Sequence, residues 1–223
     1  MVRGASEVTF ADRDEAGRRL GDEVSRVLPD DGPGRPLVLA LPRGGVPVAV
    51  QVAERIGGDL DLLLARKIGA PHQPEYGVGA IAEDGPPVFD TTALGRLDLT
   101  VDDLAGTVRA ERAELARRAR RYRGGRPAPR VAGRCVVLVD DGLATGVTAR
   151  AALRGLRHQQ PRWLALAIPV CAPPAYEGLR GDADQLICLA APPGFRAVGE
   201  WYTDFHQLTD EDVDRALRGF ASA

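Results

Sequence analysis

The stretch of sequence that decides the fold is VVLVDDGLATGVT, residues 136–148. Its first four residues are apolar and mostly β-branched, which is typical of a strand buried on both faces of a sheet. Two adjacent carboxylates, Asp140 and Asp141, follow this strand. A short loop of small and hydroxyl-bearing residues then leads into a helical pattern that begins near Val147. The stretch is therefore predicted to form a strand, a turn and the start of a helix.

The turn and the helix start together predict an anion site. Unpaired backbone N–H groups and the helix dipole favour negative charge at a helix N-terminus, and the hydroxyls of Thr145 and Thr148 add donors. We expect this loop, with Gly142, Thr145, Gly146 and Thr148, to surround a phosphate. Asp140 and Asp141 cannot bind the same phosphate, so they require ribose hydroxyls, a magnesium ion, or both. These residues predict a site for a sugar phosphate.

Strands and helices alternate along the chain. Strands are predicted at residues 37–41, 60–65, 136–139, 163–170 and 185–189, and helices at 10–28, 46–56, 101–122, 147–156, 174–179 and 210–220. A loop is predicted at 68–79, followed by a hairpin of 80–82 with 87–89. This order predicts a doubly wound α/β fold, with a mainly parallel five-stranded sheet and helices on both faces. We expect one domain over residues 1–223, with a core at about 37–189 and a small hood at about 190–208, to which the N-terminus could contribute.

Polar residues follow three of the predicted strands. Arg43-Gly44-Gly45 follows the first, Arg66-Lys67 the second, and Asp140-Asp141 the third. In a parallel sheet the carboxyl ends of the strands meet at one edge, where ligands bind. We therefore expect these three groups to meet at a single site.

The stretch at 136–148 closely resembles the phosphoribosyl pyrophosphate signature of the type I phosphoribosyltransferases: an apolar strand, two acids, a short loop and Thr-Gly-x-Thr. The resemblance covers about residues 37–189. It implies a Mg²⁺-dependent enzyme that moves phosphoribosyl from phosphoribosyl pyrophosphate to a nitrogenous base and releases pyrophosphate. It implies that Asp140 and Asp141 hold the ribose hydroxyls and contact the metal only indirectly, and that residues 144–148 hold the 5′-phosphate. Arg43, Gly44 and Gly45 match the turn that binds pyrophosphate.

Arg66 and Lys67 resemble an Arg-Lys pair that leads into a mobile loop in the orotate and adenine members of the family. Lys67 is the only lysine of the chain. Negative charge grows on the departing pyrophosphate, so Lys67, Arg66 and a protonated His72 are the candidate catalytic groups. His72 stands at the spacing of the orotate enzymes, although a lone histidine in a polar loop is also typical of a solvated residue. Closure of residues 69–79 would exclude water.

The acceptor is less well defined by the sequence. Where the hypoxanthine and guanine enzymes have an aspartate that exchanges a proton with the purine, this chain has Ala144, and Val147 replaces a lysine; both changes argue against a 6-oxopurine. Trp201, Tyr202 and Phe205 could stack on a planar base. Glu200, Asp204 or His206 could read its edge. Equally, the aromatic residues could simply seal the end of the sheet.

The composition of the chain limits the classes of protein to which it can belong. The 223 residues are 44% hydrophobic and 27% charged, with a formal net charge of −2, which gives no general argument for nucleic acid. No apolar run approaches the ~20 residues of a membrane span, and residues 1–10 lack the apolar core of a signal peptide. Cys135, Cys171 and Cys188 are too scattered for a zinc site and indicate buried thiols. We expect a cytoplasmic protein without a membrane partner.

The arginines of residues 101–122 invite a nucleic-acid interpretation. One helical stripe nevertheless contains Leu104, Val108, Leu115, Ala119 and Tyr122, and Glu114 can pair with Arg118. An amphipathic helix packed on the core is therefore favoured, with no nucleic-acid partner, and a homodimer is expected.

Two other functions remain open. The chain could be a catalytically reduced sensor or regulator that kept a nucleotide or phosphoribosyl pyrophosphate pocket. It could also be an enzyme that hydrolyses the activated sugar or uses an acceptor other than a base. Retention of Lys67 favours the transferase, because a sensor needs no group to assist a leaving group.

Overall fold

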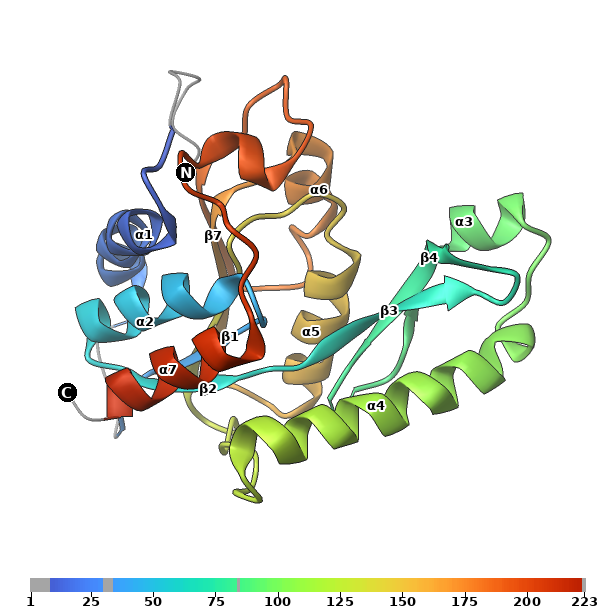
Figure 1. Ribbon diagram of the computed structural model, residues 1–223, viewed down its shortest axis with the longest axis horizontal. Coiled ribbons are helices and arrows are strands. Elements are labelled where there is room, and N and C mark those ends of the chain that lie inside the picture. Colours follow the sequence, from blue (N-terminus) through green and yellow to red (C-terminus); the bar gives the residue numbers. More distant parts are fainter. Residues whose placement is uncertain (1–8, 30–33, 84, 222–223) are drawn as a thin grey trace. The chain divides into compact units, whose positions relative to one another are not determined.

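A five-stranded sheet with strand order β2-β1-β6-β7-β8 forms the core of the computed structural model, which describes residues 9–29, 34–83 and 85–221 (Figure 1). All four neighbouring pairs are parallel. The strands are β1 (Leu37–Ala40), β2 (Asp59–Leu62), β6 (Cys135–Val139), β7 (Trp163–Val170) and β8 (Gln185–Ala190). The central strand β6 is buried along its whole length, as its run of apolar residues predicts.

The chain divides into two compact units. The first contains this sheet and comprises Met1–Leu62, Val131–Gly146 and Gln159–Ala223. The second comprises Leu63–Arg130 and Val147–His158. The expectation of one domain over residues 1–223 stays a prediction.

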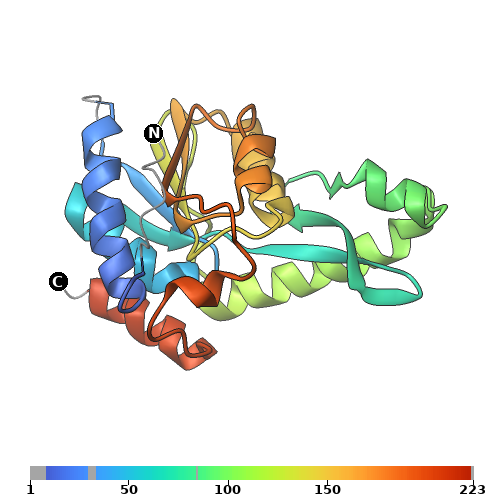
Figure 2. The same cartoon turned by 90° about the horizontal axis from the view of Figure 1, so that it is seen from above.

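Helices cover the sheet of the first unit. These are α1 (Arg13–Val27), α2 (Gly45–Ile56), α6 (Pro173–Gly178), the short 3-10 helix η2 (Val198–Trp201) and α7 (Asp210–Ala221). In two perpendicular views α1 and α2 lie on one side of the sheet and α6 on the other (Figures 1 and 2). Helix α1 approaches α2 closely at Gly17, where an added Cβ would lie 2.8 Å from the Val48 carbonyl oxygen. The predicted α/β fold with a parallel five-stranded sheet is confirmed.

The second unit is built on a three-stranded antiparallel sheet with order β3-β4-β5. Its elements are β3 (Ala65–Ala70), β4 (Gln73–Ala82), β5 (Val88–Phe89), α3 (Thr91–Arg96), the 3-10 helix η1 (Asp102–Leu104), α4 (Ala105–Arg123) and α5 (Val147–His158). The predicted stripe is confirmed at Leu115 and Tyr122 of α4 and at Leu104 just before the helix, which are buried. Its other two members, Val108 and Ala119, are half-buried. Glu114 accepts from Arg118 at 2.9 Å, the predicted pairing.

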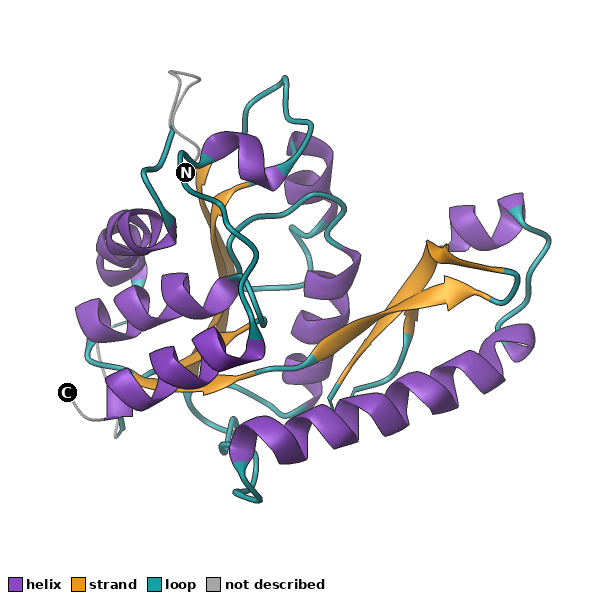
Figure 3. Cartoon of the chain, in the orientation of Figure 1, coloured by secondary structure: helices purple, strands orange, loops and turns teal. Residues whose placement is uncertain are grey.

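Two predictions for residues 60–79 are wrong. The predicted loop at 68–79 is instead most of a hairpin of β3 and β4, drawn as strands in Figure 3. The second parallel strand ends at Leu62, so Arg66 and Lys67 lie within β3 and do not follow a strand of the main sheet. The hairpin has register shifts on both sides of Gly69. These irregularities and its glycines remove the alternating pattern by which a strand is recognised in a sequence.

Candidate functional site

The two acids stand directly after β6, at the carboxyl edge of the parallel sheet. Register pairs the last residue of β6, Val139, with Ala40, the last residue of β1, so these two strands end together, while β7 continues past Ala167 to Val170. The Asp141 backbone N–H donates to Asp140 Oδ1 at 2.9 Å. This places both carboxyl groups of the pair at the position where ligands bind in open parallel sheets.

Burial disfavours the charged form of both acids. It raises the pKa of Asp140 well above its usual range, and the neighbouring charge of Asp141 raises it further. Burial also raises the pKa of Asp141, while the Arg13 guanidinium acts in the opposite direction. A single guanidinium cannot balance two buried carboxylates. The pair is therefore suited to hydroxyl donors or a further cation from a ligand.

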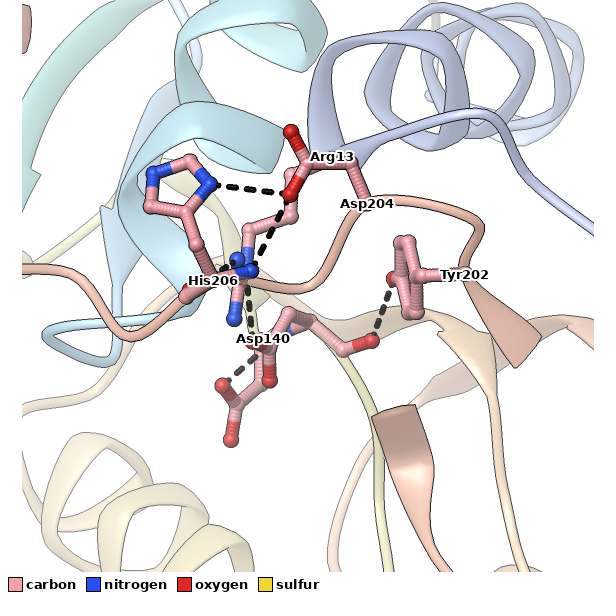
Figure 4. A network of polar contacts seen from close by, with 6 residues as sticks. Arg13, Asp140, Tyr202, Asp204 and His206 are labelled. Atoms are coloured by element: carbon pink, nitrogen blue, oxygen red, sulfur yellow. Dashed lines mark hydrogen bonds and ion pairs between the residues drawn. The ribbon is translucent and has the colours of Figure 1, made fainter. Parts of the chain in front are cut away.

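Arg13 is the residue that sequence reasoning missed. It is the first residue of α1, and its Nε donates to Asp141 Oδ2 at 2.9 Å (Figure 4). Its Nη1 donates to the His206 carbonyl oxygen at 3.1 Å. The two partners lie 128 and 193 positions away along the chain, so no local pattern indicates this contact.

The Arg43-Gly44-Gly45 turn packs tightly against the acids, as the strand-end argument predicts. A Cβ on Gly45 would lie 2.7 Å from the Val139 carbonyl oxygen, and one on Gly44 would overlap the Asp141 carboxylate. Only glycine allows the backbone to approach so closely. The Pro42–Arg43 peptide bond is cis, and Arg43 Nη1 lies 3.9 Å from Asp210 Oδ1.

The loop after the acids is anchored to the adjacent strand. Leu143 N–H donates to the Val170 carbonyl at 2.9 Å, and the Leu143 carbonyl accepts from Ala172 N–H at 2.8 Å. Ala144 and Thr145 are exposed. Gly146 has a φ of +77°, a conformation that side chains rarely adopt. The chain then continues directly into α5, whose first residues, Val147 and Thr148, belong to the second unit.

The aromatic residues after η2 form a packed cluster. The Tyr202 ring lies between those of Phe10 and Phe205, with centroid separations of 5.4 Å and 4.9 Å. The Tyr202 hydroxyl donates to the Asp141 carbonyl oxygen at 2.6 Å. Phe10 also pairs with Tyr202 through the backbone, which brings the start of the described chain to the segment that follows η2.

Each aromatic candidate therefore has a different environment. Tyr202 is only 6% exposed and its hydroxyl is already engaged, which fits the sealing interpretation. Phe205 lies under the Arg13 guanidinium, 3.9 Å from its carbon. The indole Nε1 of Trp201 is buried and has no hydrogen-bond partner among the described residues. Contact of Trp201, Tyr202 and Phe205 with an acceptor base stays a prediction.

The candidate catalytic residues belong to the second unit. Lys67 Nζ donates to the Glu75 carbonyl across the hairpin at 2.7 Å, and Arg66 pairs with Glu111 of α4. His72 is exposed in the turn between β3 and β4. Lys67 and Arg66 line a cavity of about 480 Å³ within this unit. Their predicted role beside the acidic pair stays a prediction.

The residues of the acidic pair suit a magnesium ion held mainly by a substrate. Mg²⁺ prefers oxygen ligands and is commonly bound by one or two carboxylates together with substrate phosphates and water. In the described part of the chain, no group of three or more His, Cys, Asp or Glu side chains could hold a metal by itself. Asp140 and Asp141 could therefore contribute only part of a coordination shell. Within the same residues, no helix is both long and apolar enough to cross a membrane.

Curated proteins similar to this chain match nearly its whole length. Two proteins of Mycobacterium tuberculosis, from strains CDC 1551 / Oshkosh and ATCC 25618 / H37Rv, bear provisional names as phosphoribosyl transferases and are 41% identical to it over 219 residues. The match covers 96% of this chain and 48% of each relative, so the chain spans about half the length of the curated relatives it matches.

A solved structure agrees with this relationship. The crystal structure of TT1426 from Thermus thermophilus has a TM-score of 0.79 and 42% identity to this chain, and the match covers 95% of this chain and 99% of that one. The phosphoribosyl transferase domain family matches residues 18–189, which include β1, the acidic pair and most of β8. By this match, the chain belongs to the phosphoribosyl transferase domain family.

Proposed function

We propose that this chain transfers phosphoribosyl from phosphoribosyl pyrophosphate to a nitrogenous base and releases pyrophosphate, with Mg²⁺ as cofactor. The observation that carries the proposal is the close packing of the Gly44-Gly45 turn against Asp140 and Asp141. It puts backbone that can approach a pyrophosphate next to carboxylates that can accept from ribose hydroxyls. A plain phosphate site would not require buried acids beside the glycines.

Each part of the donor has a candidate partner. Asp140 and Asp141 accept from the ribose hydroxyls, residues 144–148 bind the 5′-phosphate, and Arg43 with its two glycines binds the pyrophosphate. The acids also help during the reaction, because the ribose ring gains positive charge as the bond from C1 to pyrophosphate breaks. When bound, Mg²⁺ would neutralise charge on the pyrophosphate.

Lys67, Arg66 and His72 would stabilise the leaving group. A lysine ammonium is a compact point charge that suits a pyrophosphate oxygen. The Lys67 Nζ is held by the backbone carbonyl of Glu75, a contact that it can exchange for an anion. The acceptor base is proposed to lie near Trp201, whose buried indole N–H has no partner in the described chain. A homodimer and a cytoplasmic location also belong to this proposal.

The proposed transfer is tested by measuring the release of pyrophosphate. The protein is incubated with phosphoribosyl pyrophosphate, Mg²⁺ and a panel of purine and pyrimidine bases, with D140N as the inactive control, and donor binding is measured separately by calorimetry. Base-dependent release is expected. Binding without release by any base would favour the sensor, release without base would favour hydrolysis of the sugar, and neither binding nor release would reject the proposal.

A further inference from the structure

Arg13 is a buried arginine beside the proposed donor site. Its side chain is 8% exposed, and arginine is rarely so buried unless it is paired. It stands at the start of α1, immediately after Asp12, which caps the helix by accepting from Glu15 N–H at 2.7 Å. The helix end that carries Arg13 is thus fixed in position by its own cap.

Three groups, from two segments far from Arg13 in the sequence, hold the guanidinium. Nε donates to the carboxylate of Asp141, Nη1 donates to the carbonyl of His206, and the ring of Phe205 lies 3.9 Å from the guanidinium carbon. The two hydrogen bonds and the cation–π contact together hold the guanidinium in place. Figure 4 shows the Arg13 side chain extending from its helix between His206 and Asp140.

The ion pair has a consequence for Asp141. One oxygen of its carboxylate, Oδ2, is held by Arg13, while the backbone carbonyl of the same residue accepts from the Tyr202 hydroxyl. Side chain and backbone are therefore both oriented before any ligand binds. A carboxylate fixed in this way loses less conformational freedom on binding, which strengthens recognition of a ligand hydroxyl.

A purely structural role would not require this partner. Buried ion pairs are often no more stabilising than apolar residues of similar volume. Arg13 is joined to one of the two acids that follow β6 and to the polypeptide after η2, and both of these border the proposed site. Its contacts thus couple α1 to the orientation of Asp141.

We propose that Arg13 is a positioning residue of the donor site, which holds the Asp141 carboxylate in the orientation that binds the ribose hydroxyls of phosphoribosyl pyrophosphate. This inference rests on the proposed function. It assigns to α1 a part in substrate recognition that the motif at 136–148 does not contain. It also predicts that donor affinity depends on a residue that makes no contact with the donor.

The experiment compares the affinity of the full chain and its variants for phosphoribosyl pyrophosphate with Mg²⁺, measured by calorimetry. R13A is expected to bind the donor about 10- to 100-fold more weakly, the usual effect of removing a group that orients a ligating side chain. R13K keeps the charge but not the planar fork, and is expected to lie between R13A and the wild type. R18A is the matched control, an exposed arginine of the same helix, and should bind as the wild type does.

Two further measurements test the contact itself and separate positioning from folding, respectively. Thermal unfolding of R13A, D141N and the double variant should show non-additive changes, because the two residues are in contact. In steady state, the KM for the donor should rise in R13A and R13K while the KM for the acceptor stays within about twofold. R13K provides this comparison if R13A does not fold.

The outcomes distinguish the two proposals. A wild-type protein that binds the donor, with folded R13A and R13K variants of equal affinity, overturns the role of Arg13 and leaves the transferase intact. Loss of stability in R13K without loss of donor affinity also overturns it, because the residue is then only structural. A wild-type protein that binds no donor overturns both.

Discussion

The backbone of Gly44 lies against the carboxylate of Asp141: a Cβ added to Gly44 would be 2.8 Å from Oδ1 and still closer to Oδ2. These two residues come from turns that follow different strands, β1 and β6, and they meet because the strands are parallel neighbours in register. The contact joins the proposed pyrophosphate turn to the proposed ribose acids.

Substitution of Gly44 by alanine tests this contact. The methyl group would force the turn and the Asp141 carboxylate apart, so G44A is expected to lower donor affinity by at least about 10-fold, which corresponds to about 1.4 kcal/mol of binding free energy. Calorimetry with phosphoribosyl pyrophosphate measures the change. G106A is the control, because a Cβ at this exposed glycine of α4 meets nothing within 4 Å. Equal affinity of G44A and the wild type would show that the turn does not border the donor.

The Asp140 carboxylate is expected to lower the stability of the fold and to strengthen donor binding. Burial raises its pKa above the ordinary value of 3.8, so the folded state binds a proton more readily than the unfolded chain. The contribution of Asp140 to the stability of the fold is therefore largest below its ordinary pKa. This contribution is lost as the pH rises through the raised pKa that Asp140 has in the folded state. D140N removes the charge and is expected to unfold about 2–4 °C higher at pH 7 for each 1 kcal/mol gained. It should no longer bind the donor.

Measurement of Tm against pH checks the predicted direction in which the Asp140 contribution to stability changes with pH. The difference in Tm between D140N and the wild type should shrink as the pH falls towards 3.8, where the wild-type carboxyl is protonated. A difference that is constant with pH would mean that the charge of Asp140 does not cause it.

Lys67 is expected to act on the leaving group. K67A should lower kcat by about 100-fold or more and change donor affinity by no more than about threefold, because the charge on the pyrophosphate grows only as the bond breaks. Single-turnover kinetics and calorimetry measure the two effects. R109A, an exposed cation of α4, is the control. An equal loss in both quantities would indicate that Lys67 acts only in ground-state binding.

All three cysteines are buried and unpaired by disulfides, as the sequence predicts. The Sγ atoms of Cys171 and Cys188 lie 2.8 Å apart, and the contact with Cys171 together with burial raises the pKa of Cys188. Since the thiolate is the reactive form, we expect less than about one thiol per chain to react with a disulfide reagent at pH 8 in the folded protein, and all of them in denaturant. Rapid labelling of Cys188 in the native protein, located by mass spectrometry, would contradict this.

One arginine of α4 is structural. Arg123 donates to both carboxylate oxygens of Glu83 at 2.9 Å, and their side chains are 7% and 11% exposed. Removing one partner leaves a buried charge, so R123A is expected to lose about 3–5 kcal/mol of unfolding free energy. Denaturant unfolding measures the loss. R120A, an exposed neighbour, should change it by less than about 0.5 kcal/mol.

Local patterns in the sequence predicted the parallel sheet, which the structure confirms, and the main part of the proposed donor site. The apolar run of β6, its two acids and the glycine turn after β1 are short continuous motifs, and the parallel arrangement brings strand ends to one edge. The family match over residues 18–189 agrees with the family that the motif at 136–148 resembles. The same local signals identified the stripe of α4, because burial on one face of a helix leaves a period in the sequence.

Only the tertiary structure decided the partner of Asp141 and the environment of Lys67. Arg13 and Asp141 are separated by 128 positions, and their contact follows from the docking of α1, which no periodicity encodes. Lys67 lies in β3 because the following segment returns as β4 and pairs with it. Strand pairing is a non-local property, and bulges at glycine hide its pattern. The sequence thus identified the groups that are proposed to bind a sugar phosphate, and the fold decided which residues are their neighbours.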